Sequence, residues 1–254
     1  YKDCILFYRL GDFYEMFFDD AIVVSKELEL TLTGKSCGAE ERAPMCGVPY
    51  HAVEGYLNKL VANGHKVAIC EQVEDPKLAK GLVKREVIRI VTPGTNTDMQ
   101  ALDESKNNYI MCIVYLADKY GISLADISTG DYFVTEVDTE RKLIDEINKF
   151  APSEIICNES FYMSGVDLSD MKNRLGIAVY SLEAWYFSDE TAENTLKEHF
   201  KVQSLEGLGL SDYACGTIAA GALLRYLYET QKNDLGNLSA VSYTHLTLPT
   251  ICSV

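Results

Sequence analysis

The chain has 254 residues, of which 47% are hydrophobic, and this length favours two modest cores over one. Its 23 basic and 38 acidic residues give a net charge of −15, which argues against general, charge-driven binding of nucleic acid. The acidity is uneven, with a net of −4 over residues 1–110 and −11 over residues 111–254. No apolar run is long enough to span a membrane, and we see no secretory signal, although the chain begins with Tyr1 instead of Met.

The first hundred residues predict a small mixed α/β unit. Gly11-Asp12 permits a bend after the first strand, and Asp19 or Asp20 can cap the helix that follows. The stretch 33–49 is rich in Gly and Pro and is expected to be a loop. In chain order, the expected elements are a strand at 4–8, helices at 19–30 and 51–64, and strands at 66–73 and 85–94.

A second α/β domain is expected after a polar stretch over 95–108, which we interpret as a linker or a short surface helix. Three strands joined by tight turns predict an antiparallel meander, and a helix, a buried strand and two later helices follow. Ser188 can cap one of these helices, and Ser211 or Asp212 the last. The expected strands are 109–117, 120–129, 130–138 and 153–158, and the expected helices are 141–150, 188–200 and 211–231.

Cysteine and histidine spacing indicates no metal site or disulfide framework. The eight cysteines form no Cys-x-x-Cys pair and have no zinc-finger spacing with the four histidines. Cys4, Cys70 and Cys112 lie in apolar runs, as reduced buried cysteines usually do. A reducing cytoplasm is therefore the simplest expectation.

Two further patterns invite a catalytic interpretation. Gly34-Lys35-Ser36 resembles the end of a phosphate-binding loop, but that motif needs Gly at position 29, which is Glu29, so an ATP site is rejected here. Carboxylates flank the strand turns of the second domain and could hold Mg²⁺ for phosphodiester cleavage, although solvated strand ends explain them more simply. These carboxylates are Asp126, Asp131, Glu136 and Asp138.

The segment FYRLGDFYEMFF, residues 7–18, places a carboxylate among many aromatic side chains. In extended backbone, Phe13 and Glu15 would project on one side while Tyr14 turns inward. A phenyl ring can stack on a base, and a neighbouring carboxylate can hydrogen-bond to the edge of that base. The alternative places Phe13 in the core and Glu15 on a helix surface, and the residues alone favour this plainer interpretation.

Longer motifs favour the base-stacking interpretation of Phe13 and Glu15 instead. The segments FYRLGDFYEMFFDDA, PMCGVPYHAVEGYLNKLVANGHKVAICEQVEDP and REVIRIVTPGT resemble the N-terminal part of the bacterial MutS family of DNA mismatch-recognition proteins. The resemblance is dense over residues 4–96 and continues more weakly through LADISTGDYFVTE and GLGLSDYACGTIAAGALLRYLYETQK. It implies a mismatch-recognition domain over 1–98, a linker at 99–107 and a connector domain with a ribonuclease-H-like α/β fold over 108–235.

The resemblance also implies site residues and partners. Phe13 and Glu15 match the Phe-x-Glu motif of the family, whose Phe stacks on the mispaired base from the minor groove and whose Glu hydrogen-bonds to it. By similarity, Met45 lies near the groove and Arg85 contacts the phosphate backbone. The implied partners are mismatched double-stranded DNA, a MutL-type protein bound through the connector, and a second subunit in the longer parent. The implied location is the bacterial cytoplasm, in association with the nucleoid.

The family pattern stops before the chain ends. Residues 236–241 match the start of the family's helical core, and residues 242–254, SYTHLTLPTICSV, resemble translated non-native sequence. The family's ATPase region is not matched, so we expect no ATP turnover, no cofactor and no metal in this chain. ATP and Mg²⁺ would belong to the longer parent. Two other functions stay open, a metal-dependent nuclease on the second domain and an acidic protein-interaction fragment without DNA binding of its own.

Overall fold

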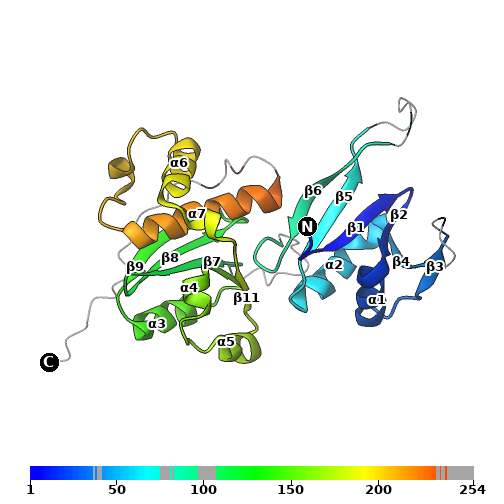
Figure 1. Ribbon diagram of the computed structural model, residues 1–254, viewed down its shortest axis with the longest axis horizontal. Helices are drawn as coiled ribbons and strands as arrows, with labels where there is room; N and C mark the ends of the chain where they lie inside the picture. The colour runs from blue at the N-terminus through cyan, green and yellow to red at the C-terminus, as the bar shows by residue number, and fades with distance from the viewer. Residues whose placement is uncertain are drawn as a thin grey trace. The chain divides into compact units, whose positions relative to one another are not determined.

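The computed structural model describes residues 1–36, 38, 42–74, 81, 83–96, 107–232, 235 and 238. It divides into two compact units, one comprising Tyr1–Glu104 with Glu229–Asn233 and the other Ser105–Tyr228 with Asp234–Val254. Each unit is built on its own β-sheet (Figure 1). The predicted α/β fold class is confirmed in both. The predicted linker over 99–107, apart from Asn107, the start of a helical core at 236–241, apart from Leu238, and the tail at 242–254 lie outside the described residues.

The first unit contains a six-stranded sheet in the order β3-β4-β2-β1-β5-β6. Neighbouring strands are antiparallel except for β1 and β5, which run parallel. The strands are β1 Ile5–Leu10, β2 Phe13–Phe17, β3 Thr33–Lys35, β4 Ala43–Pro49, β5 Val67–Gln72 and β6 Arg85–Val91.

Helices α1, Phe18–Glu27, and α2, Val53–Ala62, pack on the same face of this sheet. Every second residue of the central strands faces them, as the period of two in a strand requires. Phe7, Met16 and Val48 are fully buried between the sheet and the helices. The other face of β1, β2 and β4 therefore carries the alternate residues, among them Phe13 and Glu15.

Two predictions for this unit are wrong. The stretch 33–49 is not a loop, because it contains the antiparallel pair β3 and β4, and β4 lies inside the sheet between β2 and β3. Its Gly and Pro content concealed the strands, which form because β4 pairs with β2 on one side and with β3 on the other. Neither Asp19 nor Asp20 caps α1, whose N-cap is Phe17. Asp20 instead accepts a hydrogen bond from the Leu6 backbone N–H at 2.9 Å.

The second unit contains a five-stranded sheet in the order β11-β10-β7-β8-β9. Strands β7, β8 and β9 form the predicted antiparallel meander, while β10 and β11 run parallel to β7. This topology is that of the predicted ribonuclease-H-like fold. The strands are β7 Ile110–Leu116, β8 Lys119–Asp126, β9 Asp131–Val137, β10 Glu154–Cys157 and β11 Ala178–Ser181.

Helices cover both faces of the second sheet (Figure 1). Helices α3, Glu140–Phe150, α4, Glu159–Tyr162, and α5, Leu168–Leu175, pack on one face. Helices α6, Asp189–Phe200, and α7, Ala214–Gln231, pack on the other. Burial on both faces explains why β7 is a continuous apolar run in the sequence. Ser188 caps α6 as predicted, whereas α7 begins at Ala214, beyond the predicted caps.

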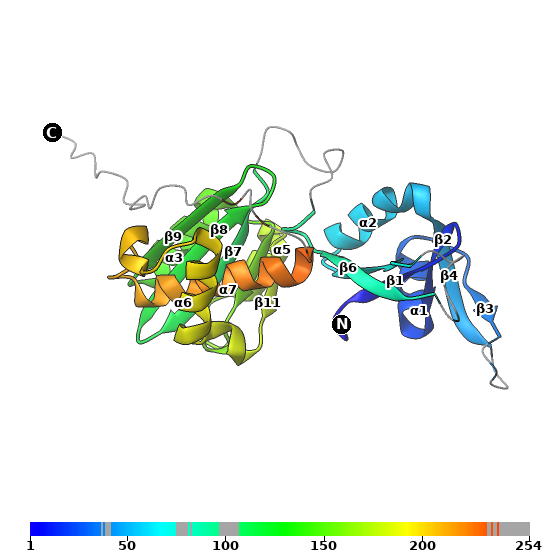
Figure 2. The ribbon, with the colours of Figure 1, turned by 90° about the horizontal axis from the view of Figure 1, so that it is seen from above.

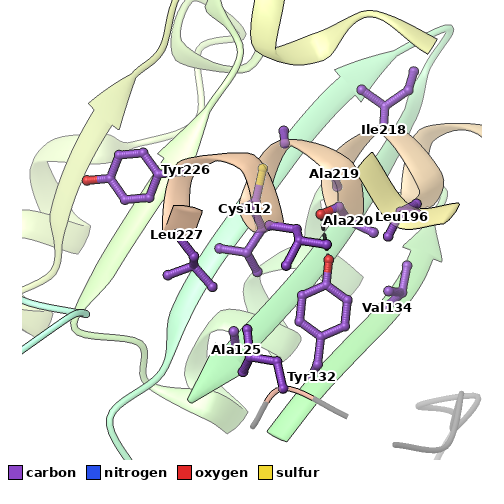
Figure 3. Close-up of a cluster of buried hydrophobic side chains, with 14 of the residues drawn as sticks. Cys112, Ala125, Tyr132, Val134, Leu196, Ile218, Ala219, Ala220, Tyr226 and Leu227 are labelled. Carbon is purple, nitrogen blue, oxygen red and sulfur yellow. Dashed lines mark hydrogen bonds between the residues drawn. The ribbon is translucent and has the colours of Figure 1, made fainter. Parts of the chain in front are cut away.

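Helix α7 lies beside α6 (Figure 2), and glycines bring it close to the sheet and to α6. A Cβ atom on Gly121 of β8 would lie 2.1 Å from the Cys215 carbonyl oxygen, and one on Gly221 would lie 2.3 Å from the Cα of Ala192. The Tyr132 hydroxyl donates to the Ala220 carbonyl within this packed layer (Figure 3). The glycines thus fix the contact surface of α7.

Sequence patterns predicted no element over residues 159–187. The structure places α4, α5, β11 and the 3₁₀ helix Ala184–Phe187 there. These elements are four to eight residues long, so their periodicity is too short to distinguish a helix from a strand. Within the described ranges, no helix combines the length and the apolar character that crossing a bilayer requires.

Candidate nucleic-acid interface

Phe13 and Glu15 lie on the outward face of β2. The Phe13 side chain is 47% exposed and Glu15 is half-buried, while Tyr14 and Met16 between and beyond them face the core. The alternation therefore places the ring and the carboxylate on one side, two residues apart on a strand inside the sheet. The alternative positions, Phe13 in the core and Glu15 on a helix surface, are excluded.

Gly47 leaves space beside this pair. It lies opposite Glu15 on the neighbouring strand β4. A Cβ atom there would be 3.7 Å from the Glu15 Cγ and 3.8 Å from the Phe13 Cδ1. A side chain at position 47 would thus cover the flank of both residues. Glycine keeps them accessible to a flat or narrow ligand.

The Glu15 carboxylate forms an ion pair with Lys35. The Lys35 Nζ lies 2.6 Å from the Glu15 Oε2, and the two side chains are 45% and 19% exposed. The same ammonium group lies 5.4 Å from the centre of the Phe17 ring. Sequence analysis missed this contact, because Lys35 was considered only in the rejected phosphate-loop pattern and β3 was expected to be a loop.

Met45 and Arg85 lie to either side of the Phe13–Glu15 pair. Met45 is half-buried on β4, opposite Phe17 and two residues from Gly47. Arg85 on β6 lies 5.1 Å above the Tyr8 ring, and Tyr8 is the β1 residue directly opposite Glu15. The sheet thus arranges the four predicted residues along β4, β2 and β6.

Arg85 already uses part of its guanidinium within the fold. Its Nε donates to the Arg9 carbonyl at 3.2 Å, and its Nη1 donates to the Val83 carbonyl at 3.0 Å. These bonds hold the guanidinium plane against the sheet and restrict the directions in which its other N–H groups can donate. A phosphate contact by Arg85 stays a prediction.

The turn before Phe13 is anchored from the inner face of the sheet. The Arg9 Nε donates to the Gly11 carbonyl, and the Tyr50 N–H donates to the Asp12 carbonyl at 2.9 Å. The Arg9 guanidinium also stacks 3.9 Å from the centre of the Tyr50 ring. Gly11 has φ of +58°, a left-handed conformation that favours glycine.

Glu71 on β5 joins this anchor to β2. Its Oε1 accepts a hydrogen bond from the Tyr14 hydroxyl and lies 3.5 Å from the Arg9 Nη1. Burial, together with the bond to Glu71, raises the pKa of Tyr14 to about 12. Tyr14 is therefore a neutral hydrogen-bond donor at physiological pH, and it ties β2, which carries Phe13, to β5 on the far side of β1.

Three of the carboxylates that flank the strand turns of the second unit have partners within that unit. Asp126 is buried and accepts hydrogen bonds from the backbone N–H groups of Asn108 and Ser128 at 2.9 and 2.8 Å. Glu136 pairs with Lys119 at 3.1 Å, and Asp138 pairs with Lys142 at 2.7 Å. In the part of the chain that the structure describes, no three His, Cys, Asp or Glu side chains gather as a metal site would require.

Comparison with known proteins matches both units to one family. The model described as MutS domain I matches residues 1–100, and the model described as MutS domain II matches residues 108–239. The chain belongs to the MutS family. It is 66% identical over 247 residues to the DNA mismatch repair protein MutS of Lachnoclostridium phytofermentans, which covers 97% of this chain and 26% of that protein.

Other MutS relatives cover a similar share of this chain. The DNA mismatch repair protein MutS of Acetivibrio thermocellus is 52% identical over 241 residues, covering 94% of this chain and 27% of that protein. The corresponding protein of Ruminiclostridium cellulolyticum is 51% identical over 241 residues, covering 94% of this chain and 27% of that protein. The chain thus spans about a quarter of the length of these MutS relatives.

Proposed function

We propose that this chain supplies the mismatch-recognition surface of a DNA mismatch repair protein. Phe13 acts as a wedge at the mispaired step, and Glu15 hydrogen-bonds to the displaced base from the minor groove. The observation that carries the proposal is the exposed phenyl ring beside a carboxylate on the outward face of β2, in a chain whose relatives are named mismatch repair proteins.

The physics of a mismatch suits such a wedge. The minor groove presents a degenerate pattern of donors and acceptors, so little sequence information can be read there. A mismatch alters stacking and stiffness instead, and a mispaired step costs less free energy to unstack and kink. An aromatic ring that inserts at the step therefore discriminates through deformation energy and is indifferent to the surrounding sequence.

Glu15 adds a second way of distinguishing a mismatched duplex from a matched one. A carboxylate near phosphates is repelled, and this repulsion is offset only where the carboxylate accepts a hydrogen bond from a base, or donates one when protonated. A displaced base offers that bond, whereas a fully stacked pair does not. The ring and the carboxylate thus respond to the same structural change in the duplex.

We propose that the further partners and the cofactors belong to the longer protein. A MutL-type protein would bind through the second unit, and dimerisation and ATP turnover would require parts of the longer relatives outside this chain. A metal-dependent nuclease is not favoured, because Asp126, Glu136 and Asp138 are engaged in turns and ion pairs. The purified chain is expected to release no phosphate from ATP.

The test is Phe13→Ala in a chimaera that joins residues 1–232 to the rest of the Lachnoclostridium phytofermentans protein. The measured quantity is the discrimination ratio, the Kd for a matched duplex divided by the Kd for the same duplex with one G·T mismatch. Loss of base–aromatic stacking, about 1–3 kcal/mol, should lower this ratio roughly 5- to 150-fold and leave matched-duplex binding nearly unchanged.

Phe18→Ala is the matched control, because Phe18 is also exposed but begins α1 on the helical side of the sheet. It should leave the ratio unaltered. An unchanged ratio for Phe13→Ala would refute the wedge assignment.

A further inference from the structure

We infer that Lys35 is a specificity-determining residue that competes with a displaced base for the Glu15 carboxylate. The inference rests on the proposed function of Glu15. Its structural basis is the ion pair between the Lys35 Nζ and the Glu15 Oε2 at 2.6 Å. In the free protein, the carboxylate assigned to the base therefore already has a partner.

The position of Lys35 suits such an exchange. Lys35 ends the short edge strand β3, two strands away from β2, so only its long side chain brings it to Glu15. The Lys35 side chain is 45% exposed, and its ammonium group also lies 5.4 Å from the centre of the Phe17 ring. A half-exposed, flexible cation can leave the carboxylate without disturbing the sheet.

The ion pair first solves an electrostatic problem. An unpaired carboxylate on a surface that meets DNA is repelled by the phosphates, and an adjacent ammonium group cancels its charge. On a matched duplex no base is displaced, so Glu15 keeps Lys35 as its partner. The surface then approaches the backbone without a net negative charge at this point.

A mismatched duplex changes the partner of Glu15. The displaced base takes over the carboxylate, and Lys35 loses its partner. The Lys35–Glu15 bond is thus broken in the mismatch complex and preserved in the matched complex. Lys35 therefore lowers discrimination. It stabilises Glu15 in the matched complex, and in the mismatch complex it competes with the displaced base for the Glu15 carboxylate.

This argument gives an unusual sign for the loss of a lysine. Lys35→Met removes one cation, so affinity for both duplexes should fall. The fall should be larger for the matched duplex, in which Glu15 is left without a partner. Because an exposed ion pair contributes little free energy, we expect the discrimination ratio to rise by only about two- to fivefold. An ordinary phosphate-binding lysine would weaken both complexes equally.

The experiment measures the discrimination ratio for Lys35→Met in the chimaera, with Glu15 and with Glu15→Gln. In the Glu15→Gln background the carboxylate is absent, and Lys35→Met should leave the ratio unchanged. Lys35→Arg keeps the cation and should stay near the parent ratio. Lys26→Met is the matched control, because it removes an exposed lysine from α1 on the helical side of the sheet.

A rise that depends on Glu15 supports the inference. An equal loss of affinity for both duplexes, or a rise that persists with Glu15→Gln, overturns it. Phe13→Ala separates this result from the proposed function as a whole. If Phe13→Ala abolishes discrimination while Lys35→Met only weakens both complexes, the role of Lys35 is refuted and the wedge stands. If Phe13→Ala has no effect, the wedge itself is refuted.

Discussion

The hydroxyl group of Tyr14 provides a quantitative test of the anchor behind Phe13. Tyr14 is 6% exposed and donates its hydroxyl hydrogen to Glu71. Its pKa is raised to about 12 from the ordinary value of 10.0, first by burial and then by the hydrogen bond to Glu71. Tyr14→Phe removes both the titrating group and the hydrogen bond and keeps the ring.

The sign of the pH effect follows from linkage. An unfolded tyrosine loses its proton as the pH rises through about 10, whereas folded Tyr14 keeps its proton until about pH 12. Between these values the folded state binds more protons than the unfolded state, so the free energy of unfolding falls as the pH rises. Two pKa units correspond to about 2.7 kcal/mol, of which about 2 kcal/mol is lost by about pH 11.5.

Tyr14→Phe should therefore unfold more easily than the parent below about pH 10, by about 1.5–3 kcal/mol for a hydrogen bond to a charged acceptor. This difference should shrink by about 2 kcal/mol towards pH 11.5. Urea titrations followed by circular dichroism at a series of pH values would measure it. Tyr56→Phe controls for the loss of a hydroxyl group, because Tyr56 packs against the core cluster that contains Tyr14. A difference that stays constant over this pH range would refute the reasoning.

Two other substitutions test separate parts of the structure. Arg85→Ala should weaken binding of the chimaera to matched and mismatched duplexes alike. Titrations over a range of salt concentrations should show that the salt slope falls by about one. A loss of affinity confined to the mismatched duplex would contradict a phosphate role. Gly121→Ala should lower the free energy of unfolding, measured by urea titration, by about 1–3 kcal/mol or more, because its Cβ would lie 2.1 Å from the Cys215 carbonyl oxygen. Gly207→Ala is the control and should have little effect, because no heavy atom lies within 4 Å of the added Cβ.

Local patterns predicted those features that depend on neighbouring residues. In an extended backbone the period of two places Phe13 and Glu15 on one face and Tyr14 on the other, as β2 has them. The residues alone favoured a buried Phe13, and the resemblance to the MutS family reversed that interpretation. The capping preference of serine identified the start of α6 at Ser188. The three strands of the second meander were visible because their turns are short and their cores are apolar.

Features that depend on distant residues were not predictable in this way. Tyr14 and Glu71 are 57 positions apart, and Lys35 and Glu15 are 20 positions apart, so only the assembled sheet brings them together. The same cause explains Asp20, whose carboxylate accepts from a β1 backbone N–H instead of capping its own helix. The β3–β4 pair was missed because its sequence is rich in Gly and Pro, and because β4 becomes a strand by pairing with β2 and β3.

The way in which β2 is held has a mechanical consequence for the proposed wedge. β2 is flanked on both sides by other strands, and its preceding turn is fastened by Arg9 and Tyr50. If Phe13 presses on a base-pair step, a ring on a compliant support would retreat from a stiff step and from a soft one alike. A ring on a rigid support transfers the strain to the duplex, so the compliance of the DNA alone decides whether the ring enters.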